Sequence, residues 1–293
     1  MKKHAWKSKI HFRCFGVFYH ARVIEIGWIG IVVAVVCLLL LALARPVLAD
    51  PPATPPDRDV IFQASTIGAL LDGVYDGDMP LSELRRHGDF GIGTINALDG
   101  ELIYLNGAFF TVRADGSVSL LTGDTQTPFA AVTHFEADHT HEVSNVVSYD
   151  RLKALVDGML PTTNICHAIR ITGVFSRVKT RSVPRQSRPY PKLAEVVKSQ
   201  PVFEFEQVSG TLVGFRLPGF VAGVNVPGYH LHFLADDLSG GGHLLDCAIA
   251  EATVEIDHSR GFFVALPATE DFSACDASQE RKEELERVEQ DDH

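Results

Sequence analysis

The stretch from residue 228 to residue 243 constrains the fold more than any other part of the chain. Apolar and polar residues alternate over its first half, which predicts a strand, and three consecutive glycines then allow the chain to reverse. Residues two apart on a strand point to the same face, so His230 and His232 stand side by side. His243 follows the glycines and returns across the turn. The sequence therefore predicts three imidazoles on one face of a strand hairpin.

Three convergent histidines are the ligand set of a catalytic zinc site, in which a fourth position stays open for water or substrate. A His-x-His pair alone is more often part of an ordinary half-buried strand, but a third histidine beyond a glycine-rich turn favours a metal site. A second His-x-His pair, His139 and His141, lies among acidic residues and has no third histidine at hairpin distance. We interpret this second pair as a polar turn outside the metal site.

Residues 1–49 have the pattern of a secretory signal peptide. A basic opening precedes an apolar run over 28–44, and small residues precede a cleavage site expected after Ala49. The alternative is an uncleaved N-terminal anchor, for which the apolar run is marginally long enough. Either reading places the rest of the chain outside the cytoplasm, in a secreted or extracytoplasmic setting. Four prolines within residues 50–57 then predict a linker.

The charge of the chain excludes several classes of partner. Removing the signal peptide, with its seven Lys and Arg residues and one Glu, takes the formal net charge from −11 to −17. Such a surface repels nucleic acid and anionic lipid, so we expect no nucleic-acid partner and no membrane partner after cleavage. Cys166, Cys247 and Cys275 remain, which allows at most one intrachain disulfide. The chain is therefore not a disulfide-stapled scaffold.

The pattern of the remaining residues predicts a β-rich α+β fold with two mixed or antiparallel sheets. Asp-Gly and Asn-Gly pairs between alternating runs predict a meander over 90–121. We divide the chain into an N-terminal half, 58–195, and a C-terminal metal-binding half with a charged tail, 196–293. Similar patterns at 91–100 and 208–219 are consistent with a duplicated unit, but the shared chemistry of hairpins would explain them equally, and we use them only to place the boundary near residue 195. Further strands are expected at 129–135, 164–179, 202–208, 210–215, 221–226, 229–234 and 243–256, and helices at 67–75, 81–87, 148–159 and 193–199.

A cluster of arginines offers a site for an anion. Arg181, Arg185 and Arg188 lie within eight residues of an otherwise acidic chain, and the planar guanidinium fork suits a carboxylate. A solvated loop is the alternative interpretation. A three-histidine metal with an adjacent arginine would suit a small anionic substrate on which negative charge develops at oxygen.

Four separated motifs resemble the α-acetolactate decarboxylase family. They are residues 228–237 with Gly241, Gly242 and His243, then 88–94, 98–102 and 181–190. The resemblance runs from about residue 62 to about residue 289. It implies a zinc-dependent decarboxylation of (S)-2-acetolactate to (R)-acetoin and CO2, and a small anionic 2-hydroxy-3-keto acid as substrate. It also implies a homodimer with a mixed sheet in each half and the metal on the second.

The resemblance further implies the roles of particular residues. Zinc binds the histidines His230, His232 and His243, and Arg181 and Glu101 line the site. A tail glutamate approaches the metal, with Glu289 the best match and Glu286 the second choice, although on sequence alone the charged tail reads as a solvated helix end. Loss of CO2 leaves an enediolate that the metal stabilises. Because arginine is a poor acid, metal-bound water or Glu101 is the expected proton source.

Two other classes of protein stay open at this point. A cupin-like oxygenase or isomerase also places His-x-His on a strand, with an acid such as Asp236 or Asp237 nearby, but its third histidine normally lies further along the chain. The other class is a non-catalytic secreted metal-binding module. Iron or manganese would favour the cupin, whereas a closed four-coordinate site would favour the binding module.

Overall fold

The computed structural model describes residues 58–276 and 281–289, which lie in one compact unit. The predicted signal peptide, 1–49, and linker, 50–57, lie outside the described residues. Among the helices that are described, none has the length and apolar character needed to cross a membrane. Within the described ranges, the first regular element begins at Val60.

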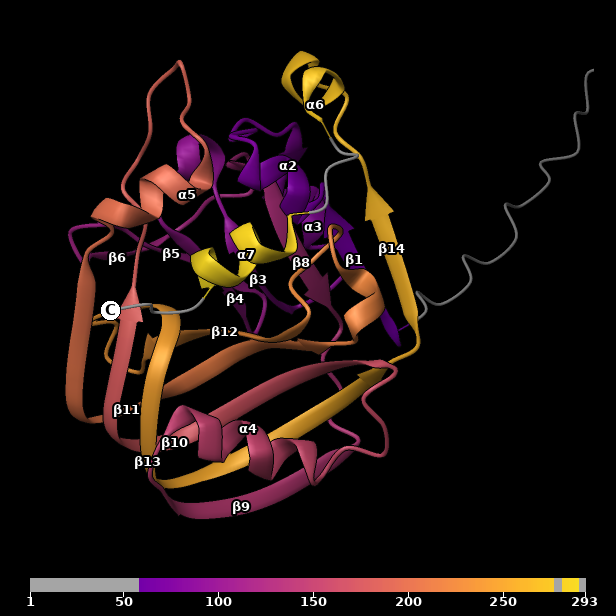
Figure 1. Ribbon diagram of the computed structural model, residues 1–293. Coiled ribbons are helices and arrows are strands. Elements are labelled where there is room, and N and C mark those ends of the chain that lie inside the picture. The colour runs from indigo at the N-terminus through magenta and orange to yellow at the C-terminus, as the bar shows by residue number, and fades with distance from the viewer. Residues whose placement is uncertain (1–57, 277–280, 290–293) are drawn as a thin grey trace, which may run out of the picture. The chain divides into compact units, whose positions relative to one another are not determined.

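The first sheet is mixed and is built around the predicted meander (Figure 1). Its neighbouring strands are antiparallel except for β1 and β14, which run parallel. The tight turns between β3 and β5 use the glycines of the Asp-Gly and Asn-Gly pairs, Gly100 and Gly107, at positive φ. In spatial order the strands are β14 (Gly261–Ala265), β1 (Val60–Ala64), β8 (Phe129–Thr133), β3 (Phe90–Thr94), β4 (Glu101–Leu105), β5 (Ala108–Val112) and β6 (Val118–Leu120).

The second sheet is antiparallel and curls until it closes on itself. Strand β10 pairs with both β11 and β13, so that four long strands form a small barrel, to which β9 is added along β13. Large apolar side chains such as Phe175 and Phe233 fill its interior. The strands are β10 (Cys166–Arg181), β11 (Val202–Leu217), β12 (Gly228–Ala235), β13 (Gly241–Ser259) and β9 (His139–Val146), and a separate pair is formed by β2 (Met79–Pro80) and β7 (Gln126–Thr127).

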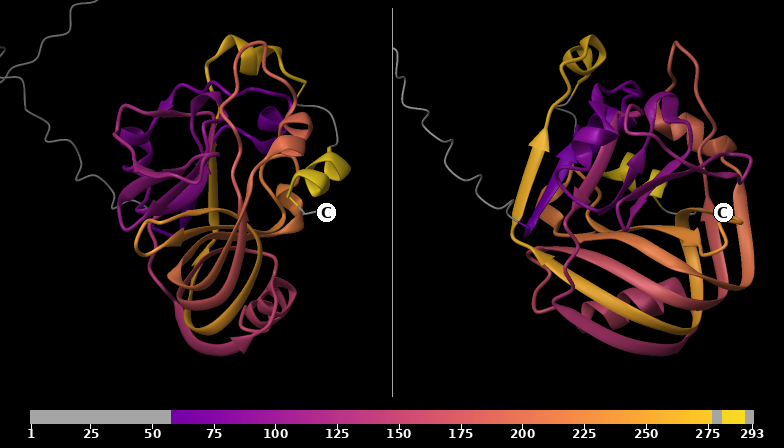
Figure 2. Two further views of the ribbon diagram at one scale, coloured as in Figure 1. Left: turned by 90° about the vertical axis from the view of Figure 1, so that its left-hand side faces the viewer. Right: turned by 180° about the vertical axis from the view of Figure 1, so that it is seen from behind.

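The helices are short and gather at two places (Figures 1 and 2). The longest of the described helices, α4, packs Leu152 and Val156 against the second sheet, and the Ser148 hydroxyl caps it by accepting from the Arg151 amide. The others include α2, α5 and α7, which share one apolar cluster with Phe129 of β8. The helices are α2 (Ile67–Leu71), α3 (Leu81–Leu84), α4 (Tyr149–Asp157), α5 (Leu193–Val196), α6 (Glu270–Ala274) and α7 (Lys282–Glu289), with 3-10 turns η1 (Asn96–Leu98), η2 (Val197–Ser199) and η3 (Gly219–Val221).

Three local predictions were wrong. The two strands expected at 202–208 and 210–215 are one continuous strand, in which Gly210 lets the Phe233 ring approach to 2.5 Å from where a Cβ atom would stand. The strand expected at 221–226 is instead η3 and a buried loop, held by Asn225 Nδ2 donating to Gln63 Oε1 at 2.5 Å. The polar turn expected at 139–141 is the start of edge strand β9.

The two sheets do not follow the two predicted halves of the chain. Strands β9 and β10 come from the first half but belong to the second sheet, and β14 comes from the second half but joins the first sheet. The sheets also differ in strand order and closure, so their topologies give no support to a duplicated unit. They pack together where β3 and β4 meet β11 and β12, through side chains such as Ile92 and Phe215. The candidate site lies beside this junction.

Candidate active site

The register of three strands sets the histidines and Arg181 side by side. His243 of β13 is the cross-strand partner of His232 on β12 and of Arg181 on β10. His230 lies two residues before His232 on the same face. The three ring centroids are 5.0 to 5.5 Å apart, and one possible ligand atom from each ring lies within 4.8 Å of the others. The predicted convergence of the three imidazoles is confirmed.

Gly242 allows this close packing of strands. Its φ of +124° is rarely adopted by other residues, and a Cβ atom there would lie 2.4 Å from the Arg181 carbonyl oxygen. A larger residue would push β13 away from β10. The glycine next to His243 is therefore a requirement of the site as well as of the turn.

The three histidines of the cluster are buried, and burial disfavours their charged forms. Burial lowers the pKa of His230 to about 3, with a further contribution from the Arg181 charge, and it lowers the pKa of His232 and His243 well below the usual range. His232 Nδ1 lies 2.9 Å from the Leu102 carbonyl oxygen, so it must carry the proton and donate it. Its Nε2 is consequently unprotonated and carries a free lone pair, and this atom has no hydrogen-bond partner among the described residues.

Two carboxyl groups complete the polar wall. Glu101, the first residue of β4, places Oε2 at 3.6 Å from His232 Nε2, and Glu289, the last residue of α7, places Oε2 at 3.7 Å from His243 Nε2 and 3.9 Å from His230 Nε2. Burial raises the pKa of both carboxyls to about 7, although the Arg181 charge opposes the shift. Glu286, the second choice for this role, is instead exposed and pairs with Lys282.

Arg181 is the one member of the arginine cluster that reaches the pocket. It is 3% exposed, and its Nη1 and Nη2 donate to Gln200 Oε1 at 2.7 Å and to the Val288 carbonyl at 2.8 Å. Arg185 instead pairs with Asp99, and Arg188 pairs with two aspartates on the surface. Of the three arginines, Arg181 alone is placed to contact an anion bound in the pocket.

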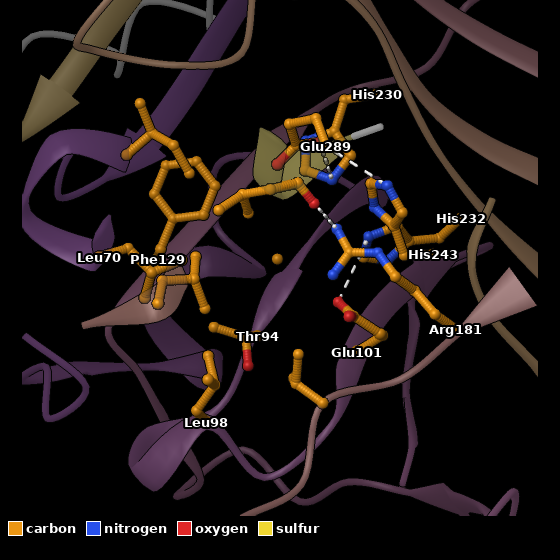
Figure 3. Close-up of a pocket in the computed structure, with 15 residues that line it drawn as sticks. Leu70, Thr94, Leu98, Glu101, Phe129, Arg181, His230, His232, His243 and Glu289 are labelled. Carbon is orange, nitrogen blue, oxygen red and sulfur yellow. Dashed lines mark hydrogen bonds and ion pairs between the residues drawn. The ribbon is translucent and has the colours of Figure 1, made fainter. Parts of the chain in front are cut away.

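The pocket also has an apolar wall, which faces the histidines in Figure 3. Leu70, Leu98 and Phe129 form it, with Thr94 at its edge. The sequence assigned no role at the site to these residues or to Gln200. Thr94 ends the glycine-rich motif at 88–94. The glycines indicated an unusual backbone conformation but did not indicate that the motif lies at the site. Only the packing of the two sheets brings Thr94 to the pocket.

The arrangement fits a bound cation. His232 Nε2 and Glu289 Oε2 are buried without hydrogen-bond partners in the described structure, although they lie close to other acceptors. Several lone pairs directed at one small space repel one another unless a cation or a proton lies between them. Three imidazoles and a carboxylate are ligands that zinc accepts. The acids of the cupin alternative, Asp236 and Asp237, are exposed in the turn between β12 and β13.

Comparison with known proteins gives one consistent family. The model of the family described as alpha-acetolactate decarboxylase matches residues 61–279. An alpha-acetolactate decarboxylase of Methanosarcina mazei is 49% identical over 231 residues, covering 79% of this chain and 80% of the relative. That of Bacillus subtilis is 44% identical over 212 residues, covering 72% and 83%. A crystal structure of alpha-acetolactate decarboxylase from Bacillus subtilis strain 168 superposes with a TM-score of 0.76 at 40% identity, over 78% of this chain and 98% of that one.

These similarities, with the fold and the buried site, define the chain as a carboxy-lyase, an enzyme that releases CO2 from a small carboxylic acid. The chain belongs to the alpha-acetolactate decarboxylase family. The resemblance seen in the four sequence motifs is thereby confirmed. Membership in this family favours a decarboxylase over the cupin-like enzyme and over the non-catalytic binding module.

Proposed function

We propose that the chain converts (S)-2-acetolactate to (R)-acetoin and CO2 with zinc held by His230, His232 and His243. The observation that carries this proposal is the meeting of three buried neutral imidazoles and two carboxyls in one pocket beside a buried arginine. The substrate is that of the relatives named above.

The ligand atoms fit zinc in their number, and the surrounding structure already orients them. When bound, zinc supplies a Lewis acid beside the ketone and hydroxyl oxygens of the substrate. The Leu102 carbonyl orients His232 from behind, in the way that outer partners fix metal-binding imidazoles. Glu289 adds an oxygen donor at the end of α7.

Arg181 is proposed to handle the negative charge of the substrate. Breaking the bond to CO2 leaves its electron pair on the carbon, and the charge moves onto the neighbouring oxygen to give an enediolate. A buried guanidinium attracts the substrate carboxylate first and the developing oxyanion afterwards, and the low polarity of the pocket strengthens both interactions. Gln200 and the Val288 carbonyl hold the guanidinium in place.

Glu101 is proposed as the proton donor. The carbon that loses CO2 must gain a proton before acetoin is released. With a pKa raised to about 7 by burial, Glu101 holds a proton in a useful fraction of molecules near neutral pH, whereas a guanidinium does not give up its proton there. The apolar wall of Leu70, Leu98 and Phe129 would cover the two methyl groups of the substrate and exclude water from the reacting carbon.

We further infer that residues 1–49 direct the protein out of the cytoplasm and that the mature chain is a homodimer. The first inference rests on the signal-like sequence and the second on the family resemblance. Mass spectrometry of the N-terminus tests cleavage after Ala49, and analytical ultracentrifugation tests the dimer. An intact N-terminus would favour the anchor instead.

The enzymatic proposal is tested with purified protein and racemic 2-acetolactate, following acetoin on a chiral column and CO2 release. We expect (R)-acetoin, loss of activity after chelation and its return with zinc. A His141→Ala variant is the matched control for removal of a cluster histidine, such as His232→Ala, and should keep zinc and activity. His141 also belongs to a His-x-His pair, but it lies on β9, outside the cluster. Acetoin formation that survives complete metal removal would overturn the zinc requirement, and no acetoin from zinc-loaded protein would overturn the activity.

A further inference from the structure

Helix α7 carries Glu289 into the site but has little stability of its own. It is eight residues long, whereas isolated helices shorter than about 12 residues are marginal in water. The helix dipole does not settle the matter, because Arg281 before its start and Glu289 at its end oppose the dipole, whereas Glu283 and Glu284 in the first turn and Arg287 in the last turn favour it. The position of Glu289 therefore depends on contacts between α7 and the rest of the protein.

One face of α7 makes these contacts. Residues 281, 285, 288 and 289 follow the spacing i, i+4, i+7 and i+8, which places them along the same side of a helix. Leu285 and Val288 are 7% and 2% exposed and pack in the cluster that includes α2 and α5. Arg281 lies at the other end of this face from Glu289, about two helical turns away.

The side chain of Arg281 is paired with the end of helix α2. It is 6% exposed, and its Nη2 lies 2.8 Å from Asp72 Oδ1. Asp72 is the C-cap residue of α2, whose residues Ile67 and Leu70 line the pocket. The ion pair thus joins the start of α7 to the element that faces the histidines.

Glu284 lies 3.7 Å from Arg281 Nη1 and is 20% exposed, so it is a second, weaker partner of this guanidinium, whereas the other charged groups of α7 described here have a different setting. The side chains of Lys282 and Glu286 are 72% and 55% exposed and lie 3.8 Å apart, and Arg287 is an exposed residue that donates to the Glu283 carbonyl. Exposed pairs of this kind contribute little to stability, whereas breaking a buried pair leaves a charge without its partner.

Asp72 begins a segment, residues 72–78, that makes further contacts with the C-terminal part of the chain. Asp78 Oδ2 accepts from the Ala268 amide at 2.9 Å, and Asp76 and Asp271 share the Arg188 guanidinium. Asp72 also accepts from the Asp276 amide at 3.4 Å. Residues 72–78 and their partner Arg188 therefore contact the C-terminal part of the chain at Ala268, Asp271, Asp276 and Arg281.

We propose that Arg281 is a positioning residue for Glu289, and that its ion pair with Asp72 holds α7 in the pose that brings the Glu289 carboxyl to the three histidines. The inference rests on the proposed function, in which Glu289 acts at the metal site. Arg281 itself lines no part of the pocket and acts through the helix.

The test measures the zinc dissociation constant by competition with a chromophoric chelator, together with kcat/KM. The variants are Arg281→Ala, Arg281→Lys, Glu289→Gln, the double variant with Arg281→Ala and Glu289→Gln, and Arg287→Ala as the matched control on the exposed face. We expect Arg281→Ala to weaken zinc binding and kcat/KM by about 10- to 100-fold, as is typical when an outer partner of a metal ligand is removed. Arg281→Lys should recover part of the loss, and Arg287→Ala should match the original protein.

The double variant separates positioning from general destabilisation. If Arg281 acts through Glu289, the double variant should be no weaker than Glu289→Gln alone, whereas independent effects would multiply and overturn the inference. An unchanged Arg281→Ala beside an impaired Glu289→Gln overturns the inference and leaves the proposed function standing. An unchanged Glu289→Gln overturns the inference and the proposed role of Glu289 at the metal, and leaves the three-histidine zinc site and the activity to the acetoin test above. Should Arg281→Ala fail to fold, Asp72→Asn removes the same ion pair with a side chain of equal size.

Discussion

Removing the metal should expose the free-energy cost of burying Glu101. Its pKa rises from the ordinary value of 4.5 to about 7, chiefly because of burial, so the folded state binds this proton more tightly than the unfolded state does. Stability from such a carboxyl is fully present below pH 4.5 and is lost as the pH rises to about 7. One pKa unit corresponds to about 1.4 kcal/mol, so the loss over this window is about 3 kcal/mol.

Glu101→Gln isolates this contribution in metal-free protein. The buried histidines have lowered pKa values and add the opposite pH dependence. Their contribution to the stability of the folded protein is lost as the pH falls below the usual pKa of histidine. Their contribution cancels when the variant and the original protein are compared at each pH. The stability of Glu101→Gln relative to the original protein should therefore rise by about 3 kcal/mol between pH 4.5 and pH 7, which is about 6–12 °C in Tm for a domain of this size.

The assay is urea unfolding followed by far-UV circular dichroism after exhaustive chelation, at pH values across that window. Tryptophan fluorescence is unsuitable, because both tryptophans of the chain lie within residues 1–49. Adding zinc is the control, since a bound cation favours the ionised carboxylate and should abolish the advantage of the variant. A stability difference that stays constant with pH would refute the reasoning.

Three other substitutions test the site. His232→Ala should lose metal and activity together while the fold survives, which metal content and circular dichroism measure; zinc retained at one equivalent would contradict its role as a ligand. Arg181→Ala should keep zinc but lower kcat by about 10²–10³-fold, and an unchanged rate would exclude it from the reaction. Gly242→Ala should destabilise the protein by more than about 2 kcal/mol in thermal unfolding, because its Cβ would meet a carbonyl oxygen, whereas Gly107→Ala, also at positive φ but with nothing within 4 Å, should cost about 1 kcal/mol; equal losses would remove the steric explanation.

Local chemistry was enough to predict the hairpin of the site. The two-residue period of a strand and the glycine-rich turn depend only on neighbours in sequence, and they place His230, His232 and His243 together without knowledge of the rest. The meander over 90–121 was predictable for the same reason. Arg181 was a candidate from the arginine cluster, and the family resemblance gave roles at the site to Arg181, Glu101 and Glu289; the structure brings all three to the pocket.

Pairings between distant segments could not be predicted in this way. Strand β14 runs parallel to β1 although their paired residues, such as Val60 and Gly261, are about 200 positions apart, and no turn signal links them. The segment 221–226 has strand-like alternation, but Asn225 is buried and bonded to Gln63 of β1, so tertiary contacts override the local pattern. The same holds for His139 and His141, whose polar sequence suggested a turn because the partner strand β13 was unknown.

The buried face of α7 shows a further limit of sequence patterns. The tail is rich in charge, and only two apolar residues, Leu285 and Val288, indicate a packed side. Their spacing is compatible with a helix face but too sparse to identify what covers it. The partner surface is assembled from α2, α5 and β8, which are distant in sequence.

The order of the site residues along the chain has a consequence for how each new molecule matures. Glu289 follows the histidines in the chain, with β14 and α6 between them. A ribosome or an export channel that passes the chain from its N-terminus therefore releases all three imidazoles before the carboxylate of α7. A metal ion arriving early meets the hairpin with one side uncovered, and α7 can dock only afterwards. Synthesis in this order therefore leaves the three imidazoles more accessible before α7 docks than afterwards.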